Sequence, residues 1–247
     1  MASQKPGVGS VQCRDLPQLE HVIVFGEEKT LRGAWRYEDL LTGVGSNSEA
    51  LLNEIERKID VDAPVFIQYT SGTTGFPKAA TLTHHNIINN AYFVGLRNRY
   101  HIGDHSICVP PPLYHCFASV LGVLSSLVHQ QTCVFPDAWF NPRRSLEVAA
   151  KEKCTWVYGT PTMFIDMLAQ LEQLKGTIDL SALDGCIIGA APVSPELCKQ
   201  LVSEMDLQSI QVYYGCTELS PIVSASLLEM NVEDRIKNSG FVLDHTE

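Results

Sequence analysis

A ten-residue segment, Tyr69-Thr-Ser-Gly-Thr-Thr-Gly-Phe-Pro-Lys78, carries the densest set of chemically useful groups in the sequence. It combines four serine and threonine hydroxyls with two glycines and one lysine, directly after an apolar run at 65–69. Hydroxyls and free backbone N–H groups bind phosphate oxygens, glycines let the backbone approach them, and a lysine adds a point charge. It is not a Walker loop, because it has no adjacent Gly-Lys-Ser/Thr. The segment therefore predicts a phosphate-binding loop, with an ordinary Ser/Thr/Gly turn as the alternative.

Three later segments place polar groups among apolar or glycine residues. They are Pro112-Leu-Tyr-His115, Gly189-Ala-Ala-Pro192 and Tyr213-Tyr-Gly-Cys-Thr-Glu218. Taken alone, His115 is more simply a structural histidine, and the adjacent His84 and His85 are interpreted in the same way. A nucleophilic role for Cys216 is not favoured, because no paired histidine or helix end that would lower its pKa is visible in the sequence.

The composition excludes several classes of protein. The chain has 247 residues, 45% of them hydrophobic and 19% charged, which is typical of a globular protein. A formal net charge of −10, without a run of Lys and Arg, argues against nucleic-acid binding. The longest apolar stretch, Cys116–Val128, is shorter than the ~20 residues of a membrane span and predicts a buried helix. The eight cysteines form no C-x-x-C pair and no set with histidines at zinc-ligand spacing, so we expect scattered buried thiols.

From Pro64 onward, short apolar runs alternate with longer amphipathic segments. Strands are predicted at 65–69, 106–109, 132–135, 155–158, 186–188 and 210–214, and another at 21–25. Helices are predicted at 49–59, 86–100, 117–129, 142–151, 161–171 and 194–204. The alternation predicts an α/β layered domain with a largely parallel sheet covered on both faces. We expect the strand at 210–214 to be the last one, with nothing after it that closes a domain.

The four polar segments, in this order, resemble the motifs of the adenylate-forming superfamily. This superfamily comprises acyl-CoA synthetases, luciferases and peptide-synthetase adenylation domains. The segment 69–78 resembles its phosphate-binding motif, and 112–115 its aromatic-histidine motif beside the acyl pocket. The segment 189–192 resembles its adenine-binding strand end, and 213–218 its Tyr-Gly-x-Thr-Glu motif. The resemblance runs from about Val65 to the C-terminus. With Gly159-Thr-Pro-Thr-Met-Phe164, it is closest to animal medium-chain acyl-CoA ligases.

The resemblance implies a fold and a two-step reaction. The fold is the central part of the N-terminal domain of an acyl-CoA synthetase. In the reaction, a fatty carboxylate attacks the α-phosphate of ATP and pyrophosphate leaves. The thiol of coenzyme A then attacks the acyl-AMP. ATP, coenzyme A and Mg²⁺ are the implied cofactors or co-substrates, and a fatty acid is the implied substrate.

The resemblance also assigns roles to individual residues. The implied phosphate-binding residues are Thr70, Ser71, Gly72, Thr73, Thr74, Gly75 and Lys78. The residues implied to flank the adenine are Gly189, Ala190, Ala191, Pro192, Tyr214 and Gly215. Three residues are implied to be catalytic: Thr217 at the α-phosphate, Glu218 as the Mg²⁺ ligand, and His115 at the carboxylate end of the acyl substrate. A histidine cannot pair with a substrate amino group as the aspartate of peptide synthetases does, which favours a plain carboxylic acid.

The sequence departs from the family pattern in two ways. Ala79 and Ala190 stand where the family usually has glycine, and a methyl group at a close backbone approach can weaken nucleotide binding. The later Thr-Gly-Asp motif, the hinge and the domain with the adenylation lysine are not found in these 247 residues. We therefore interpret 1–63 as a partial N-terminal region with a linker at 42–48, and 64–247 as an AMP-binding subdomain incomplete at its C-terminus.

Two alternatives to a medium-chain fatty acid–CoA ligase stay open. One is an adenylate-forming ligase for another carboxylic acid, and the other is a truncated, non-catalytic nucleotide-binding module. The resemblance points to mitochondria, whereas the first 20 residues have neither transit-peptide nor signal-peptide character.

Overall fold

The computed structural model describes residues 11, 13–26, 33–42, 45, 48–71 and 75–246. The chain divides into two compact units, Met1–Asp60 and Val61–Glu247. In the first unit, strands β1 (Ile23–Val24) and β2 (Trp35–Arg36) pair in parallel. Helices α1 (Tyr37–Thr42) and α2 (Ser48–Glu56) follow, and no residue of either helix is buried. The strand predicted at 21–25 and the helix predicted at 49–59 are thus confirmed in shortened form.

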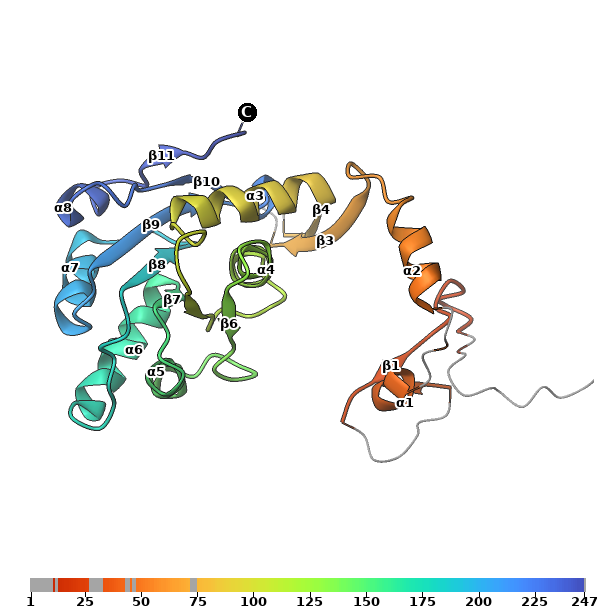
Figure 1. The fold of residues 1–247 in the computed structure, drawn as a ribbon, viewed down its shortest axis with the longest axis horizontal. Helices are drawn as coiled ribbons and strands as arrows, with labels where there is room; N and C mark the ends of the chain where they lie inside the picture. The colour runs from red at the N-terminus through yellow and green to blue at the C-terminus, as the bar shows by residue number, and fades with distance from the viewer. Residues whose placement is uncertain are drawn as a thin grey trace, which may run out of the picture. The chain divides into compact units, whose positions relative to one another are not determined.

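The second unit is built on a seven-stranded sheet with the order β11-β10-β9-β8-β7-β5-β6 (Figure 1). Its strands are β5 (Ser106–Cys108), β6 (Thr132–Val134), β7 (Trp156–Gly159), β8 (Gly185–Gly189), β9 (Ser209–Gly215), β10 (Ile222–Ala225) and β11 (Phe241–Val242). The five strands β5, β6, β7, β8 and β9 run parallel to one another. Strands β10 and β11 continue the sheet beyond β9 in antiparallel pairs. The predicted α/β class with a largely parallel sheet is confirmed.

Helices cover both faces of this sheet. They are α3 (His84–Arg97), the π-helix η1 (Phe117–Leu124), α4 (Ser125–Val128), α5 (Pro142–Lys151), α6 (Pro161–Leu174), α7 (Pro195–Glu204) and α8 (Val232–Arg235). One core cluster packs α5, α6 and α7 against one face, and a second packs α3 and η1 against the other. Successive strand residues alternate between the clusters, with Ile188 in the first and Ile187 in the second. Burial on both faces explains the uniformly apolar strands.

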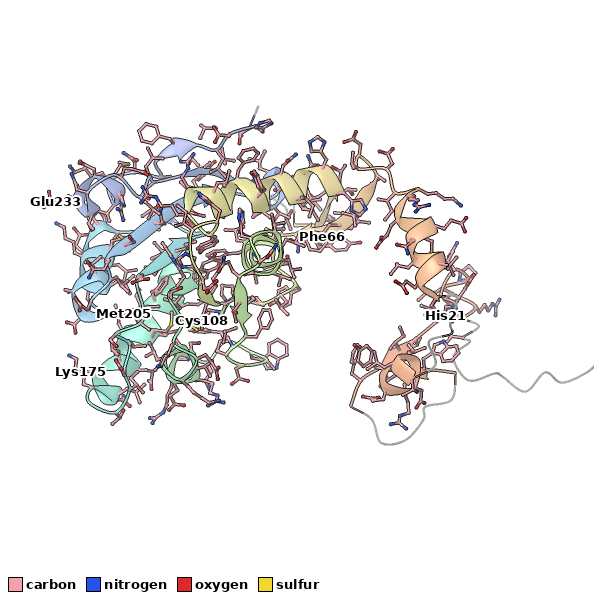
Figure 2. The ribbon with its side chains drawn as sticks, in the orientation of Figure 1. His21, Phe66, Cys108, Lys175, Met205 and Glu233 are labelled. Atoms are coloured by element: carbon pink, nitrogen blue, oxygen red, sulfur yellow. The ribbon has the colours of Figure 1, made fainter. Side chains whose placement is uncertain are left out.

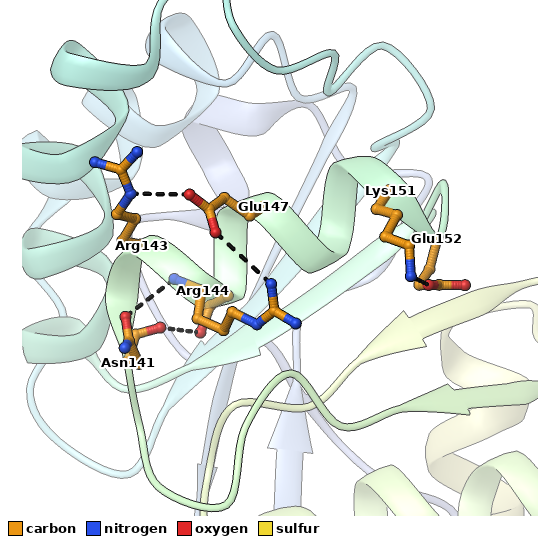
Figure 3. A network of polar contacts seen from close by, with 7 residues as sticks. Asn141, Arg143, Arg144, Glu147, Lys151 and Glu152 are labelled. Atoms are coloured by element: carbon orange, nitrogen blue, oxygen red, sulfur yellow. Dashed lines mark hydrogen bonds and ion pairs between the residues drawn. The ribbon is translucent and has the colours of Figure 1, made fainter.

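Local signals explain where the helices begin. Thr83 caps α3 and exchanges hydrogen bonds with Asn86, so two free N–H groups are satisfied together. Asn141 caps α5 by accepting a bond from the Arg144 N–H at 3.0 Å, and Pro142 follows at the first helical position (Figure 3). Glu147 pairs with Arg143 one turn earlier at 2.8 Å. The predicted bounds of α5 agree with the structure because these signals are local.

A separate two-stranded hairpin precedes α3. Strand β3 (Pro64–Thr70) pairs antiparallel with β4 (Lys78–Thr83), and Thr70 stands opposite Lys78 in the register. The strand β4 is absent from the sequence prediction, because its alanines and threonines give no clear apolar run. Residues 72–74, between β3 and β4 in the sequence, lie outside the described residues.

One further expectation is wrong. The strand at 210–214 is not the last one, since β10 and β11 continue the sheet beyond it. These short strands are defined by pairing with neighbouring strands rather than by their own residue pattern. The helix predicted at 117–129 is confirmed, since the π-helix η1 and the α-helix α4 together cover 117–128 without a break. It is buried as expected, and no described helix has the length and apolar character needed to cross a membrane. Figure 2 shows Cys108 in the interior and Lys175 at the surface.

Candidate active site

The carboxyl ends of several strands meet at a cavity of about 250 Å³, called here the central cavity. Seven of the residues singled out in the sequence line it: Thr70, His115, Gly189, Ala190, Gly215, Thr217 and Glu218. Thr70 ends β3, Gly189 ends β8 and Gly215 ends β9. Ligand sites in parallel α/β sheets lie at this edge, because loops from neighbouring strands converge there. The fold thus brings together residues up to 148 positions apart (218 − 70).

The loop 216–221 presents Thr217 and Glu218 to the central cavity. It closes on itself through a bond from the Cys216 N–H to the Pro221 carbonyl at 2.9 Å. A Cβ on Gly215 would stand 2.0 Å from the Pro221 oxygen, so only glycine fits there. Thr217 and Glu218 lie in the short 3₁₀ turn η2 (Thr217–Leu219). The tight turn holds both side chains at the cavity.

His115 lies at the cavity with a defined tautomer. Its Nδ1 accepts a bond from the Phe117 N–H at 3.1 Å, which assigns the proton of the neutral ring to Nε2. Although His115 is exposed overall, partial burial of the imidazole lowers its pKa below the ordinary 6.5. The histidine is therefore mainly neutral near pH 7 and can donate one hydrogen bond. Beside it, Cys116 Sγ is 3.7 Å from Thr217 Oγ1.

A second cavity of about 500 Å³, called here the tyrosine cavity, adjoins the first. Both are lined by Ala190, Tyr213 and Gly215, and the tyrosine cavity adds Ala191, Pro192 and Tyr214. Tyr213 is 4% exposed and belongs to the core, whereas its neighbour Tyr214 is 60% exposed. The strand alternation therefore leaves the Tyr214 ring available as a stacking face.

Ala190 has a φ of 67°, in the left-handed region that favours glycine. Its backbone is thus held in a strained form at the junction of the two cavities. This explains why the related motif usually carries glycine at the position.

The predicted phosphate-binding segment is only partly visible. Thr70 lines the central cavity, whereas Ser71, Gly75 and Lys78 do not. Gly72, Thr73 and Thr74 lie outside the described residues. Gly75 has a φ of 85°, which requires glycine, and the exposed Lys78 starts β4 opposite Thr70. The hairpin thereby places the lysine and Thr70 on adjacent strands.

Among the residues that the structure describes, Glu218 is the one carboxylate that lines the central cavity. Within the described ranges, neither a lysine nor an arginine forms an ion pair with the Glu218 carboxylate. The same residues contain no group of three or more His, Cys, Asp or Glu side chains that could hold a metal ion. Mg²⁺ is commonly held by one or two carboxylates plus substrate phosphates and water. The single carboxylate of Glu218 therefore fits an ion that binds together with a phosphate ligand.

The sequence prediction missed several residues at the site. Cys116, Phe117 and Ile222 line the central cavity. Asn90 on α3 holds both backbone groups of Ile222, at 2.7 Å and 3.2 Å. Gln68 on β3 is 6% exposed and bonds to the backbone beside His115. A polar side chain at an inward position of the apolar strand β3 was the available signal for Gln68.

Neither thiol at the central cavity, Cys116 or Cys216, has the lowered pKa of an activated nucleophile. Burial raises the pKa of Cys116, and burial together with the nearby Glu218 raises that of Cys216. All eight cysteines are free, and five of them are buried, as expected from the sequence.

Comparison with known proteins identifies one matching family and a similar acyl-CoA ligase. The family model "AMP-binding enzyme" matches residues 10–247. The chain is 40% identical over 240 residues to "Medium-chain acyl-CoA ligase ACSF2, mitochondrial" of Danio rerio, covering 97% of this chain and 39% of the relative. The chain thus spans about two fifths of the length of the curated relatives it matches.

Two solved structures show the same fold. The anthranilate CoA ligase AuaEII, in complex with anthranoyl-AMP, matches with a TM-score of 0.74 and 21% identity, over 93% of this chain and 42% of its own. The long-chain-fatty-acid-CoA ligase FadD1 of Archaeoglobus fulgidus matches with a TM-score of 0.65 and 23% identity, over 90% and 47%. From the family match over nearly its whole length, this chain belongs to the AMP-binding enzyme family.

Proposed function

We propose that this chain carries the adenylate-forming site of a medium-chain fatty acid–CoA ligase. One observation carries the proposal: a single cavity is lined by residues of all four motifs, Thr70, His115, Gly189 and the pair Thr217 and Glu218. The 40% identity to a medium-chain acyl-CoA ligase supports the substrate class. Because that relative is named mitochondrial, mitochondria are the proposed compartment.

In this proposal the nucleotide spans both cavities. The adenine lies in the tyrosine cavity between the Tyr214 ring and the backbone at Ala190–Pro192. The triphosphate enters the central cavity, where Thr70 and Thr217 supply hydroxyl groups. Lys78 lies outside the cavity lining, opposite Thr70 on β4, and supplies a positive charge from there. The remaining phosphate-binding residues are Ser71–Gly75. Such fixed donors act where charge develops on the phosphates during reaction.

Glu218 would hold Mg²⁺ beside the phosphates. When bound, the ion neutralises phosphate charge and polarises the α-phosphate for attack. The chain contributes a carboxylate held in place by the closed loop 216–221, without a competing cationic side chain in the described residues.

His115 orients the acyl substrate. Its neutral imidazole donates from Nε2 to one carboxylate oxygen, and the other oxygen attacks the α-phosphorus as the bond to pyrophosphate breaks. The thiol of coenzyme A then attacks the acyl carbonyl carbon, the thiol proton is lost, and AMP leaves. The preference for a neutral donor fits a carboxylic acid substrate without an amino group.

An ATP–pyrophosphate exchange assay tests this proposal. Labelled pyrophosphate is supplied with ATP and Mg²⁺ to the intact protein, with octanoate, with benzoate or with no acid. We expect exchange that depends on octanoate and exceeds exchange with benzoate. Stronger exchange with benzoate would support a ligase for aryl acids, and no exchange with any acid would support a non-catalytic nucleotide-binding module.

A further inference from the structure

The side chain of Gln68 bridges the backbone on both sides of His115. Its Nε2 donates to the Tyr114 carbonyl at 2.9 Å, and its Oε1 accepts from the Cys116 N–H at 3.0 Å. Both hydrogen bonds of the carboxamide therefore form in one orientation only. A flipped amide would place its oxygen against the Tyr114 carbonyl oxygen and its NH₂ group against the Cys116 N–H. Gln68 is 6% exposed, so water does not readily replace these bonds.

The other contacts of the loop that carries His115 lead to the helix η1 and to the core, and not to β3. The His115 carbonyl accepts from the Ala118 and Ser119 N–H groups at 2.9 and 3.0 Å, and the next residue, Cys116, is buried. Leu113 is 50% exposed and Tyr114 is 75% exposed, so these side chains do not anchor the loop by packing. Within the loop, the His115 N–H bonds to the Pro112 carbonyl at 3.0 Å, which shapes the turn without tying it to another element. The two hydrogen bonds of the Gln68 side chain connect this loop to β3.

Gln68 also lies two residues before Thr70, on the same strand. Residues i and i+2 of a strand share one face, and Thr70 lines the central cavity together with His115. The bridge thus links the strand that leads into the phosphate-binding loop with the loop that presents the histidine.

We propose that Gln68 is a positioning residue that fixes the acyl-facing His115 relative to the phosphate-binding strand through its two backbone hydrogen bonds. This rests on the proposed function, since the carboxylate and the α-phosphate must meet in near-attack geometry. Gln68 itself touches neither substrate.

Gln131 provides a matched control. Its carboxamide bridges backbone groups in the same manner, donating to the Tyr100 carbonyl and accepting from the His105 N–H. It does not line the central cavity or the tyrosine cavity. Losing its bridge should affect folding stability but not substrate use.

The first measurement is amide hydrogen exchange of the intact protein without substrates, which is independent of the enzymatic proposal. We expect the Cys116 amide to be protected in the wild type. In Gln68→Met it should exchange at least about tenfold faster, because its acceptor is lost. Gln68→Glu keeps an acceptor for the Cys116 N–H but turns its second oxygen toward the Tyr114 carbonyl, so protection should be only partly retained. Rapid exchange of Cys116 in the wild type would overturn the proposal without use of any variant.

The second measurement is steady-state kinetics of thioester formation. Gln68→Met should raise the KM for octanoate about tenfold and lower kcat, and leave the KM for ATP within about twofold. Gln68→Glu should recover part of the loss, and Gln131→Met should change neither KM. Equal changes in the KM values for octanoate and ATP, or the same profile in Gln131→Met, would overturn the positioning role. If a wild-type protein that also carries the adenylation lysine and the ribose-binding aspartate has no activity, the proposed function is contradicted instead, and amide hydrogen exchange still tests the Gln68 contact.

Discussion

At the scale of single residues, Glu218 is placed for chemistry rather than for folding. It is exposed at the mouth of the central cavity and has no cationic partner among the described side chains. Glu218→Gln keeps the size and removes the charge. We expect octanoate-dependent pyrophosphate exchange to fall about a hundredfold or more, with the melting temperature nearly unchanged. Glu56→Gln, on the exposed helix α2, is the control. Exchange at the wild-type rate in Glu218→Gln would refute the assignment.

Lys78 should act on the nucleotide and not on the fold. It is exposed at the start of β4 and forms no ion pair within the described part of the chain. Lys78→Ala should weaken ATP binding by about 1.5–3 kcal/mol, the scale of a hydrogen bond to a charged group. Isothermal titration calorimetry measures the change, with Lys199→Ala on α7 as the control. Unchanged ATP affinity together with a lowered melting temperature would mean that Lys78 is structural.

His115 predicts a specific pH dependence of stability. Burial lowers its pKa in the folded state below 6.5, so the unfolded chain binds its proton more tightly. The contribution of His115 to the free energy of unfolding is constant above about pH 7. It decreases as the pH falls through 6.5 and becomes constant again below the folded-state pKa. His115→Gln should therefore lose less stability than the wild type between pH 7 and pH 5. Urea unfolding at each pH measures this, with the exposed His101→Gln as the control. Parallel curves for wild type and His115→Gln would contradict the prediction.

At the scale of elements, the turn between β9 and β10 depends on one glycine. A Cβ at position 215 would lie 2.0 Å from the Pro221 carbonyl oxygen and 2.9 Å from the Ile222 Cα, and backbone atoms cannot move aside cheaply. Gly215→Ala should therefore open the loop 216–221 and destabilise the protein by about 2–4 kcal/mol. It should also displace Thr217 and Glu218 from the cavity.

Chemical denaturation and ATP binding together test this role of Gly215. Gly45→Ala is the control, because the nearest atom to its Cβ would be 3.9 Å away. Wild-type stability and ATP affinity in Gly215→Ala would show that the turn adapts.

At the scale of the whole molecule, the chain spans 39% of the length of its Danio rerio relative. The adenylation lysine and the ribose-binding aspartate implied by the resemblance are not found in its 247 residues. We therefore expect a polypeptide limited to these residues to form octanoyl-CoA at background level with ATP, Mg²⁺ and coenzyme A, so the pyrophosphate-exchange and kinetic measurements above require a protein that also carries those two groups. Turnover near ~10 s⁻¹, a typical enzyme rate, would show that residues within this chain suffice for catalysis.

The sequence by itself determined the features that depend on neighbours along the chain. Asn141 before Pro142 specifies the start of α5, and Ser194 before Pro195 specifies that of α7, because a capping side chain acts within one helical turn. The four motifs were likewise recognisable, since each is a short continuous string. The apolar strands from β5 to β9 were predicted because burial on both faces leaves a clear composition.

The tertiary structure alone decided which of these parts meet. Strands β10 and β11 form only because an existing sheet edge offers hydrogen-bonding partners, so their own residues give little signal. Gln68 bonds to Tyr114 at a separation of 46 residues, and no local pattern specifies that contact. The central cavity likewise exists because parallel strands end at one edge of the sheet, where distant loops converge. Packing of the whole domain determines which distant segments meet. Many residues together specify that packing, and no short segment of the sequence specifies it alone.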